Sequence, residues 1–281
     1  MNENLADKPQ HKSDLKNLDE LNKTAVNFDD THDGITFEVL ETEAVDGKQE
    51  LRRGVYLVPN LITAASMLSA FFSVIASSNG NFGKACLAIF LSAILDGMDG
   101  RAARMLNAQS PFGEQLDSLA DCIAFGLAPA VLMYFFTLHN LGRLGIACAF
   151  VFMACAAFRL ARFNVQIGTV DKKYFIGLAS PLAAILITSS VLVAKDHGAM
   201  LATSLTVLCA IWTVLCGFLM VSNVKYYSFK EFDKQKVPFV TLIIGVLVMG
   251  VVLYDIPVGI LAIGVIYALS GIVTTVRAKI G

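Results

Sequence analysis

Long apolar segments recur through most of the chain, separated by short polar breaks. A helix that spans a bilayer needs about 20 apolar residues, because each residue rises 1.5 Å along the helix axis. The pattern predicts eight spanning helices, near residues 58–78, 82–104, 113–137, 143–165, 175–194, 200–222, 237–253 and 256–276. Only a short polar break at Tyr254 and Asp255 divides the last two segments, and Pro257 opens the final one. These two segments are therefore expected to form a tight helical hairpin.

Lysine and arginine residues fall unevenly on the two sides of this predicted arrangement. If the amino terminus is cytosolic, fourteen basic residues of the segment from 51 onward lie on the inner side. Only Lys84, Arg143 and Lys195 lie on the outer side. Short cytosolic loops are enriched in lysine and arginine, so this bias predicts that both termini face the cytosol. The short basic loop at 223–236 falls on the same side.

Composition agrees with a membrane protein. The chain of 281 residues is 56% hydrophobic and 16% charged, whereas soluble domains carry about 25% charged residues. Its mean hydropathy is +0.63. The predicted fold class is therefore an all-α, polytopic membrane helical bundle. Six cysteines lie inside apolar segments without metal-type pairing, and we expect them to be reduced and buried.

The net charge of −1 conceals two very different regions. Residues 1–50 hold 13 acids and 5 lysines, whereas the remainder holds 10 acids and 17 bases. An acidic segment with few aromatic residues and no apolar stretch predicts a disordered cytosolic tail rather than a signal peptide. The expected organisation is a tail at 1–50, a six-span catalytic core at 51–222, the basic loop at 223–236 and the hairpin at 237–281.

Four aspartates form a cluster inside this apolar sequence. Asp96, Asp99, Asp117 and Asp121 are accompanied by a fixed set of small and basic residues, Gly100, Ala103, Arg104 and Gly113. Ionisable groups at membrane depth are costly, and clustered acids repel one another unless a cation neutralises them. The pattern therefore indicates a site for divalent metal. An alternative is a set of acids that line a water-filled cavity, as in a cation transporter.

Helical geometry places these residues on two facing surfaces. At 100° per residue, the first group, from Asp96 to Arg104, covers roughly 140° of arc on the second helix. Gly113, Asp117 and Asp121 cover about 80° on the third helix. The segment between the helices contains Ser110-Pro111, which is typical of a helix start. Two antiparallel helices should therefore present two carboxylates each near their cytosolic ends.

Carboxylate oxygens favour hard cations, so the expected cofactors are two ions of Mg²⁺ or Mn²⁺ rather than zinc. Paired metals are used in phosphoryl chemistry to clamp the attacking and leaving oxygens. Gly100 and Gly113 would leave room for a bulky anionic ligand near the backbone. Arg104 would neutralise phosphate charge that the metals leave uncompensated.

The complete pattern Asp-x2-Asp-Gly-x2-Ala-Arg-x8-Gly-x3-Asp-x3-Asp resembles the signature of the CDP-alcohol phosphotransferase family of integral membrane enzymes. All eight positions match. The resemblance implies a six-span core in which Asp96, Asp99 and Asp117 hold two metals. It further implies that Asp121 contacts metal and acts as the general base. Gly100, Ala103, Arg104 and Gly113 would shape the site for the CDP moiety.

Other segments bear on the acceptor alcohol. The run Pro59-Asn60-Leu61-Ile62-Thr63 resembles the start of the family's first helix, where Asn60 and Thr63 would face the donor. The segment 159–164, the pair Gly177-Leu178 with Pro181, and the segment 222–230 resemble the phosphatidylserine synthases within the family. The resemblance covers roughly residues 55–230. It implies transfer of the phosphatidyl group from CDP-diacylglycerol to L-serine, which gives phosphatidylserine and CMP.

The residues themselves are compatible with serine as acceptor. Arg159 and Arg162 lie one turn apart at the cytosolic end of the fourth helix, and arginine suits two-point binding of a carboxylate. Asn164 adds further donors and an acceptor. The alternative is that both arginines only set the topology and contact lipid headgroups. A phosphorylated acceptor such as glycerol-3-phosphate or inositol phosphate would require a more basic pocket. The resemblance also suggests a homodimer, and the expected location is the inner membrane of a bacterium.

Overall fold

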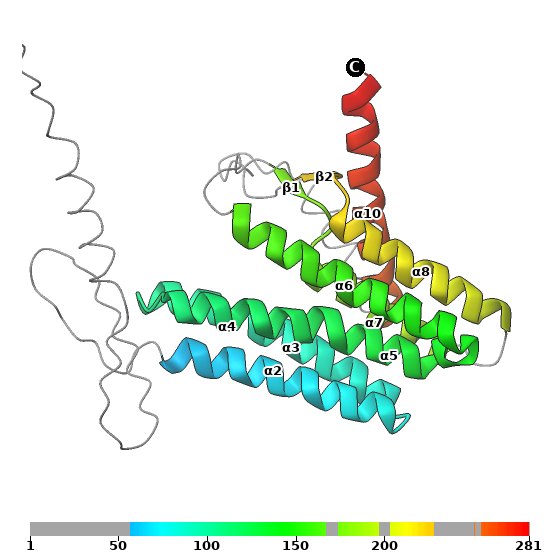
Figure 1. Cartoon of the computed structure of the whole chain (residues 1–281), viewed down its shortest axis with the longest axis horizontal. Helices are drawn as coiled ribbons and strands as arrows, with labels where there is room; N and C mark the ends of the chain where they lie inside the picture. The colour runs from blue at the N-terminus through cyan, green and yellow to red at the C-terminus, as the bar shows by residue number, and fades with distance from the viewer. Residues whose placement is uncertain (1–56, 167–173, 197–202, 228–249, 251–253, 281) are drawn as a thin grey trace, which may run out of the picture. The chain divides into compact units, whose positions relative to one another are not determined.

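The computed structural model describes residues 57–166, 174–196, 203–227, 250 and 254–280. The described residues belong to one compact unit, and the predicted tail at 1–50 and the seventh predicted span at 237–253 lie outside them except for residue 250. The described elements are helical apart from two three-residue strands, which confirms the all-α membrane class (Figure 1).

The helices follow the predicted apolar segments closely. In chain order they are α2 (Leu57–Ser78), α3 (Phe82–Met105), α4 (Pro111–Asp121), the π-helical η1 (Cys122–Leu127), α5 (Ala128–Phe136), the short η2 (Leu138–Leu141), α6 (Arg143–Gln166), α7 (Ser180–Asp196), α8 (Thr203–Val221) and α10 (Ile256–Ile280). Three rods are long and apolar enough to cross a membrane: 57–78, 111–136 and 143–165. The apolar helices at 205–221 and 256–271 are shorter. The eight-span count stays a prediction.

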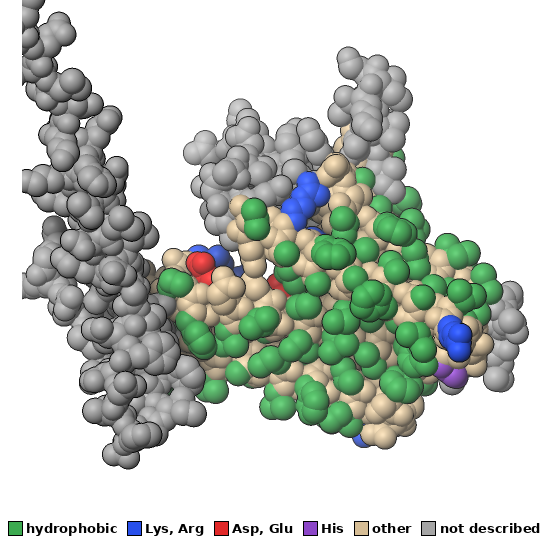
Figure 2. Space-filling view, viewed as in Figure 1, with side chains coloured by type: hydrophobic (Ala, Val, Ile, Leu, Met, Phe, Trp, Pro, Cys, Tyr) green, Lys and Arg blue, Asp and Glu red, His purple; other side chains and the backbone are tan. Residues whose placement is uncertain are grey.

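Small hydroxyl residues join α2 to α3 over their length. Ser66 and Ser92 lie with their Oγ atoms 2.8 Å apart, and Ser69 Oγ donates to the Ala88 carbonyl at 2.8 Å. Small side chains let helix backbones approach closely in lipid, where hydrogen bonds and packing replace the hydrophobic effect. The outward surfaces are strongly apolar, with Leu68 at 67% exposure (Figure 2). This is the surface expected of a protein whose solvent is hydrocarbon.

The connection from α3 to α4 follows from its residues. Asn107 adopts φ +49°, which ends α3 in a left-handed turn that asparagine tolerates. Ser110 then caps α4 by accepting the Gly113 backbone N–H at 3.0 Å, and Pro111 occupies the first helical turn. Serine caps and an early proline are the expected helix-start signals. The turn reverses the chain and packs α4 against α2, with Asp117 of α4 facing Asp96 and Asp99 of α3.

The start of the fifth predicted helix differs from the sequence-based expectation. The fifth helix begins at Ser180 rather than near residue 175, because Tyr174–Ile176 forms strand β1. This strand pairs antiparallel with β2 (Lys225–Tyr227), with residue 174 opposite 227. Gly177 follows at φ +80°, where an added Cβ would lie 2.3 Å from the Met220 carbonyl oxygen. The close approach ties the loop before α7 to the end of α8.

Candidate active site

The acidic cluster lies between α3 and α4. One carboxylate oxygen from each of Asp96, Asp99 and Asp117 lies within 4.8 Å of the others. Asp96 and Asp99 are three residues apart on α3 and therefore share a face, and Asp117 meets them from α4. The two helices thus present their acids to each other. Three of the four predicted ligands converge on one point.

Asp121 lies one turn deeper along the same rod. Its carboxyl group interacts with that of Asp96 and experiences the charges of Asp99 and Asp117. Its Oδ1 atom is buried and has no hydrogen-bond partner among the described residues. A buried carboxylate oxygen without a partner is costly, so this atom is placed to accept a proton or to bind a ligand.

The donor set fits a divalent cation. Carboxylate oxygens are hard ligands, and four acids in so small a volume need positive charge between them. Asp99 is also held in place, since it is only 4% exposed and its Oδ2 accepts the Thr63 hydroxyl at 2.7 Å. Its Oδ1 accepts the Gly100 backbone N–H. Such supporting bonds orient the carboxylates that ligate metals.

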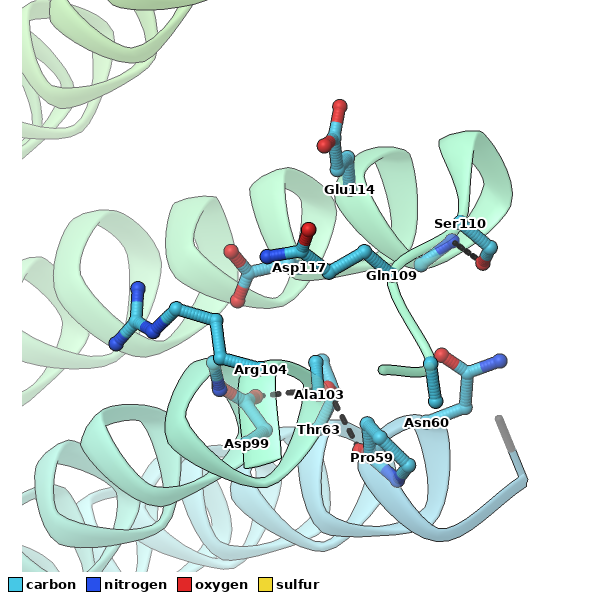
Figure 3. Close-up of a pocket in the computed structure, with 13 residues that line it drawn as sticks. Pro59, Asn60, Thr63, Asp99, Ala103, Arg104, Gln109, Ser110, Glu114 and Asp117 are labelled. Carbon is cyan, nitrogen blue, oxygen red and sulfur yellow. Dashed lines mark hydrogen bonds between the residues drawn. The ribbon is translucent and has the colours of Figure 1, made fainter. Parts of the chain in front are cut away.

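A cavity of about 130 Å³ opens beside the acids (Figure 3). All six residues predicted to bind the CDP-linked donor line it, together with Asp99 and Asp117: Asn60, Thr63, Gly100, Ala103, Arg104 and Gly113. The remaining lining residues are Pro59 at the start of α2, Ala108, Gln109 and Ser110 in the loop before α4, and Glu114 in the first turn of α4. The cavity thus joins the start of α2 to residues 99–117, which lie about forty residues further along the chain.

The two glycines of the pattern differ in their surroundings. A Cβ added at Gly100 would meet no atom within 4 Å, so this glycine leaves open space in the cavity wall. A Cβ added at Gly113 would lie 3.1 Å from both the Asn60 Oδ1 and the Ser110 Oγ atoms. Gly113 therefore permits the close approach of α4 to α2, a packing role that the sequence did not indicate.

The three acceptor candidates diverge at the end of α6. Arg159 lies within range of the charge of Asp121, and its Nη1 donates to Ser180 Oγ at 2.8 Å. Arg162 instead donates to the Val221 carbonyl at 3.3 Å and to Asn223 Oδ1 at 2.8 Å.

Asn164 donates from Nδ2 to Ser118 Oγ at 2.9 Å, which links α6 to α4. Of the three candidates, Arg159 is the one whose charge partner is an acid of the cluster.

Sequence reasoning missed several contributors to the site. Ser180 was not singled out, although its place beside Pro181 at a helix start was a usable signal. Glu114 and Gln109 flank the acids in the chain, but neither belongs to the recognisable pattern. The π-helical turn that begins at Cys122, directly after Asp121, has no sequence signature, although π turns are frequent at functional sites.

The family described as CDP-alcohol phosphatidyltransferase matches residues 56–215. A CDP-diacylglycerol--serine O-phosphatidyltransferase of Helicobacter pylori (strain ATCC 700392 / 26695) is 44% identical over 177 residues, which is 63% of this chain and 74% of that protein. The protein of the same name from Bacillus subtilis (strain 168) is 34% identical over 62% of this chain and 92% of its own length. That of the archaeon Methanocaldococcus jannaschii is 30% identical over 80% of this chain and 97% of its own length.

Proposed function

The chain belongs to the CDP-alcohol phosphatidyltransferase family, and from this premise we propose that it transfers the phosphatidyl group of CDP-diacylglycerol to L-serine. The products are phosphatidylserine and CMP. The names of the bacterial and archaeal relatives support serine as acceptor. The observation that carries the proposal is the convergence of three aspartates beside a cavity lined by all six predicted donor-binding residues. Membership of a transferase family also disfavours the cation-transporter alternative.

The donor occupies the cavity in this proposal. Asp96, Asp99, Asp117 and Asp121 would hold two divalent cations, Mg²⁺ or Mn²⁺, which neutralise the pyrophosphate charge when bound. Arg104 points from α3 into the space that faces Asp117 and adds positive charge for a phosphate (Figure 3). Asn60 and the open wall at Gly100 accommodate the nucleotide. The acyl chains extend into the bilayer along the apolar helix surfaces.

Asp121 acts as general base. Its unpartnered, buried Oδ1 accepts the proton of the serine hydroxyl. The hydroxyl oxygen forms a bond to the phosphorus that carries diacylglycerol, and the bond from that phosphorus to the CMP oxygen breaks. The chain contributes positioning and charge stabilisation, which are the main sources of catalysis in phosphoryl transfer.

Arg159 supplies the acceptor contact. It combines proximity to Asp121 with a guanidinium group suited to a carboxylate. Arg162 and Asn164 were candidates for the same contact, and their observed bonds suit them to holding α8 and α4 around the acceptor site. The acceptor alcohol thus lies between α4, α6 and the start of α7.

Sidedness, organisation and assembly complete the proposal. The basic loops support an orientation in which both termini and the site face the cytosol, in the inner membrane of a bacterium. The four-part organisation is retained: an acidic tail at 1–50, a six-span core at 51–222, a loop at 223–236 and a two-helix hairpin at 237–281. We propose a homodimer as the assembled state.

The test is release of CMP by the purified protein in detergent micelles that contain CDP-diacylglycerol. L-serine, glycerol-3-phosphate and inositol phosphate are supplied in separate reactions, each with and without a chelator. Serine-dependent release that chelation abolishes and Mg²⁺ or Mn²⁺ restores is the expected result. Release that depends on a phosphorylated acceptor instead of serine would overturn the acceptor assignment.

A further inference from the structure

The end of α6 and the start of α7 meet through one buried hydrogen bond near the acidic cluster. Arg159 donates from Nη1 to the Oγ atom of Ser180 at 2.8 Å. Ser180 is the first residue of α7 and is completely buried. A serine hydroxyl that accepts from a guanidinium fixes the direction of a side chain that otherwise has several rotatable bonds. The bond to Ser180 therefore holds the guanidinium group of Arg159 in one orientation.

Two complementary polar atoms lie unsatisfied beside this bond. The Nε atom of Arg159 and the Oδ1 atom of Asp121 are both buried, and neither has a hydrogen-bond partner among the described residues. They are consequently not bonded to each other, although the charge of Asp121 acts on Arg159. Buried donors and acceptors are normally paired, so this unpaired donor and unpaired acceptor are available to a polar ligand that carries both complementary groups.

The chemistry of the two atoms describes that ligand. The arginine requires an acceptor and suits a carboxylate, whereas the aspartate requires a donor such as a hydroxyl. A short hydroxy amino acid carries both groups. Its carboxylate would bind Arg159 while its hydroxyl reaches Asp121, and the hydroxyl would then be directed at the donor phosphate.

We propose that Ser180 is a positioning residue for the acceptor: its bond to Nη1 turns the Nε edge of Arg159 toward Asp121, which creates the carboxylate subsite. This inference rests on the proposed function, because it assigns the acceptor of the same reaction. Ser180 itself touches no substrate. Its loss should weaken acceptor binding and leave unaffected the donor cavity, which neither Ser180 nor Arg159 lines.

The first experiment compares Ser180→Ala with Ser189→Ala. Ser189 is a matched control, since it lies on the same helix, is completely buried and has no hydrogen-bond partner for its hydroxyl among the described residues. Ser180→Ala should raise the KM for L-serine about tenfold, as expected for a lost bond to a charged group. Its KM for CDP-diacylglycerol should stay within about twofold. Ser189→Ala should leave both constants unchanged.

A second measurement separates carboxylate recognition from a general disturbance of the site. Serinol has the hydroxyl and amino groups of serine but no carboxylate. Wild-type protein should favour L-serine over serinol, and Ser180→Ala should reduce that preference about tenfold. Ser180→Thr, which keeps the hydroxyl, should restore the preference. If Ser180→Ala does not fold, Ser180→Cys replaces the oxygen by a weak sulfur acceptor at similar volume and should reduce the preference likewise.

The outcomes distinguish this inference from the proposed function. Wild-type protein without serine-dependent CMP release would refute the proposed function itself. Serine-dependent release with an unchanged preference in both Ser180→Ala and Ser180→Cys would refute only the positioning role. An increased KM for CDP-diacylglycerol with no change for serine would also overturn it, because Arg159 would then serve the donor.

Discussion

The hydroxyl of Thr63 is the side-chain link from α2 to the metal-binding acids. Its Oγ1 atom lies 2.7 Å from Asp99 Oδ2 and 3.1 Å from the Pro59 carbonyl oxygen, and the residue is 3% exposed. The sequence suggested that Thr63 contacts the donor. Although Thr63 lines the cavity, its short bond to Asp99 indicates that it also holds that carboxylate toward the other acids. The substitution Thr63→Val removes the hydroxyl and preserves the shape.

The expected magnitude follows from the charge on the acceptor. A hydrogen bond to a charged group contributes about 1.5–3 kcal/mol, which corresponds to roughly 10–150-fold in an equilibrium constant. Loss of an orienting partner typically reduces metal affinity or activity about 10–100-fold. We therefore expect the Mn²⁺ concentration for half-maximal activity to rise about 10–100-fold. Saturating metal should restore most of the wild-type rate, because the ligand itself remains.

The assay is CMP release at saturating serine and CDP-diacylglycerol over a titration of Mn²⁺. Thr213→Val is the matched control, since Thr213 is completely buried and its hydroxyl donates only to a backbone carbonyl of its own helix, that of Cys209, at 2.7 Å. An unchanged Mn²⁺ requirement in Thr63→Val would refute the orienting role. An increase confined to the KM for CDP-diacylglycerol would instead support direct donor contact.

Four further substitutions test separate parts of the site. Asp121→Asn should lower kcat at least about 100-fold while CDP-diacylglycerol binding persists, and retention of full activity would remove the base assignment. Gly113→Ala should lower the free energy of unfolding by about 1–3 kcal/mol, measured by thermal denaturation in detergent, because its Cβ would crowd Asn60 at 3.1 Å. Gly100→Ala should leave stability nearly unchanged but raise the KM for CDP-diacylglycerol, since its Cβ would enter the cavity. Arg162→Ala should cost about 0.5–1.5 kcal/mol of stability with little effect on serine KM, and a large KM change would show direct acceptor contact.

Local signals account for what the sequence predicted correctly. Apolar segments of spanning length give the helices, and Ser110-Pro111 marks the start of α4 close to its observed position. Because i and i+3 residues share a helix face, spacing predicted that Asp96 and Asp99 lie together, and the turn at Ser110-Pro111 predicted that Asp117 meets them from the next helix. The donor-binding set needed the family resemblance as well, since Asn60 lies on α2, far from the acids in sequence.

Features that depend on tertiary contacts were not predictable. The pairing of β1 with β2 joins segments separated by about fifty residues. Strands of three residues are too short to show the alternation of apolar and polar residues that would predict it. The close contact of Gly113 with Asn60 likewise arises only once α2 and α4 pack. The divergence of Arg162 from Arg159 depends on where α8 ends, which helical spacing on α6 does not encode.

The π-helical turn of η1 lies between α4 and α5, and it lets these two helices face their neighbours at angles that are set independently. A π turn holds more residues than an α turn, so α5 is rotated relative to the angle that a continuous α-helix from Pro111 would impose. Before η1, the direction in which Asp121 projects from α4 is set by the acids that its carboxyl group faces. Near the end of η1, Gly126 approaches α6 so closely that an added Cβ would lie 3.2 Å from the Ala156 Cβ. Deleting one residue from η1 would restore regular α-helical winding and turn α4 by about 100° relative to α5. The chain could then keep Asp121 facing the other acids or keep the packing against α6, but not both.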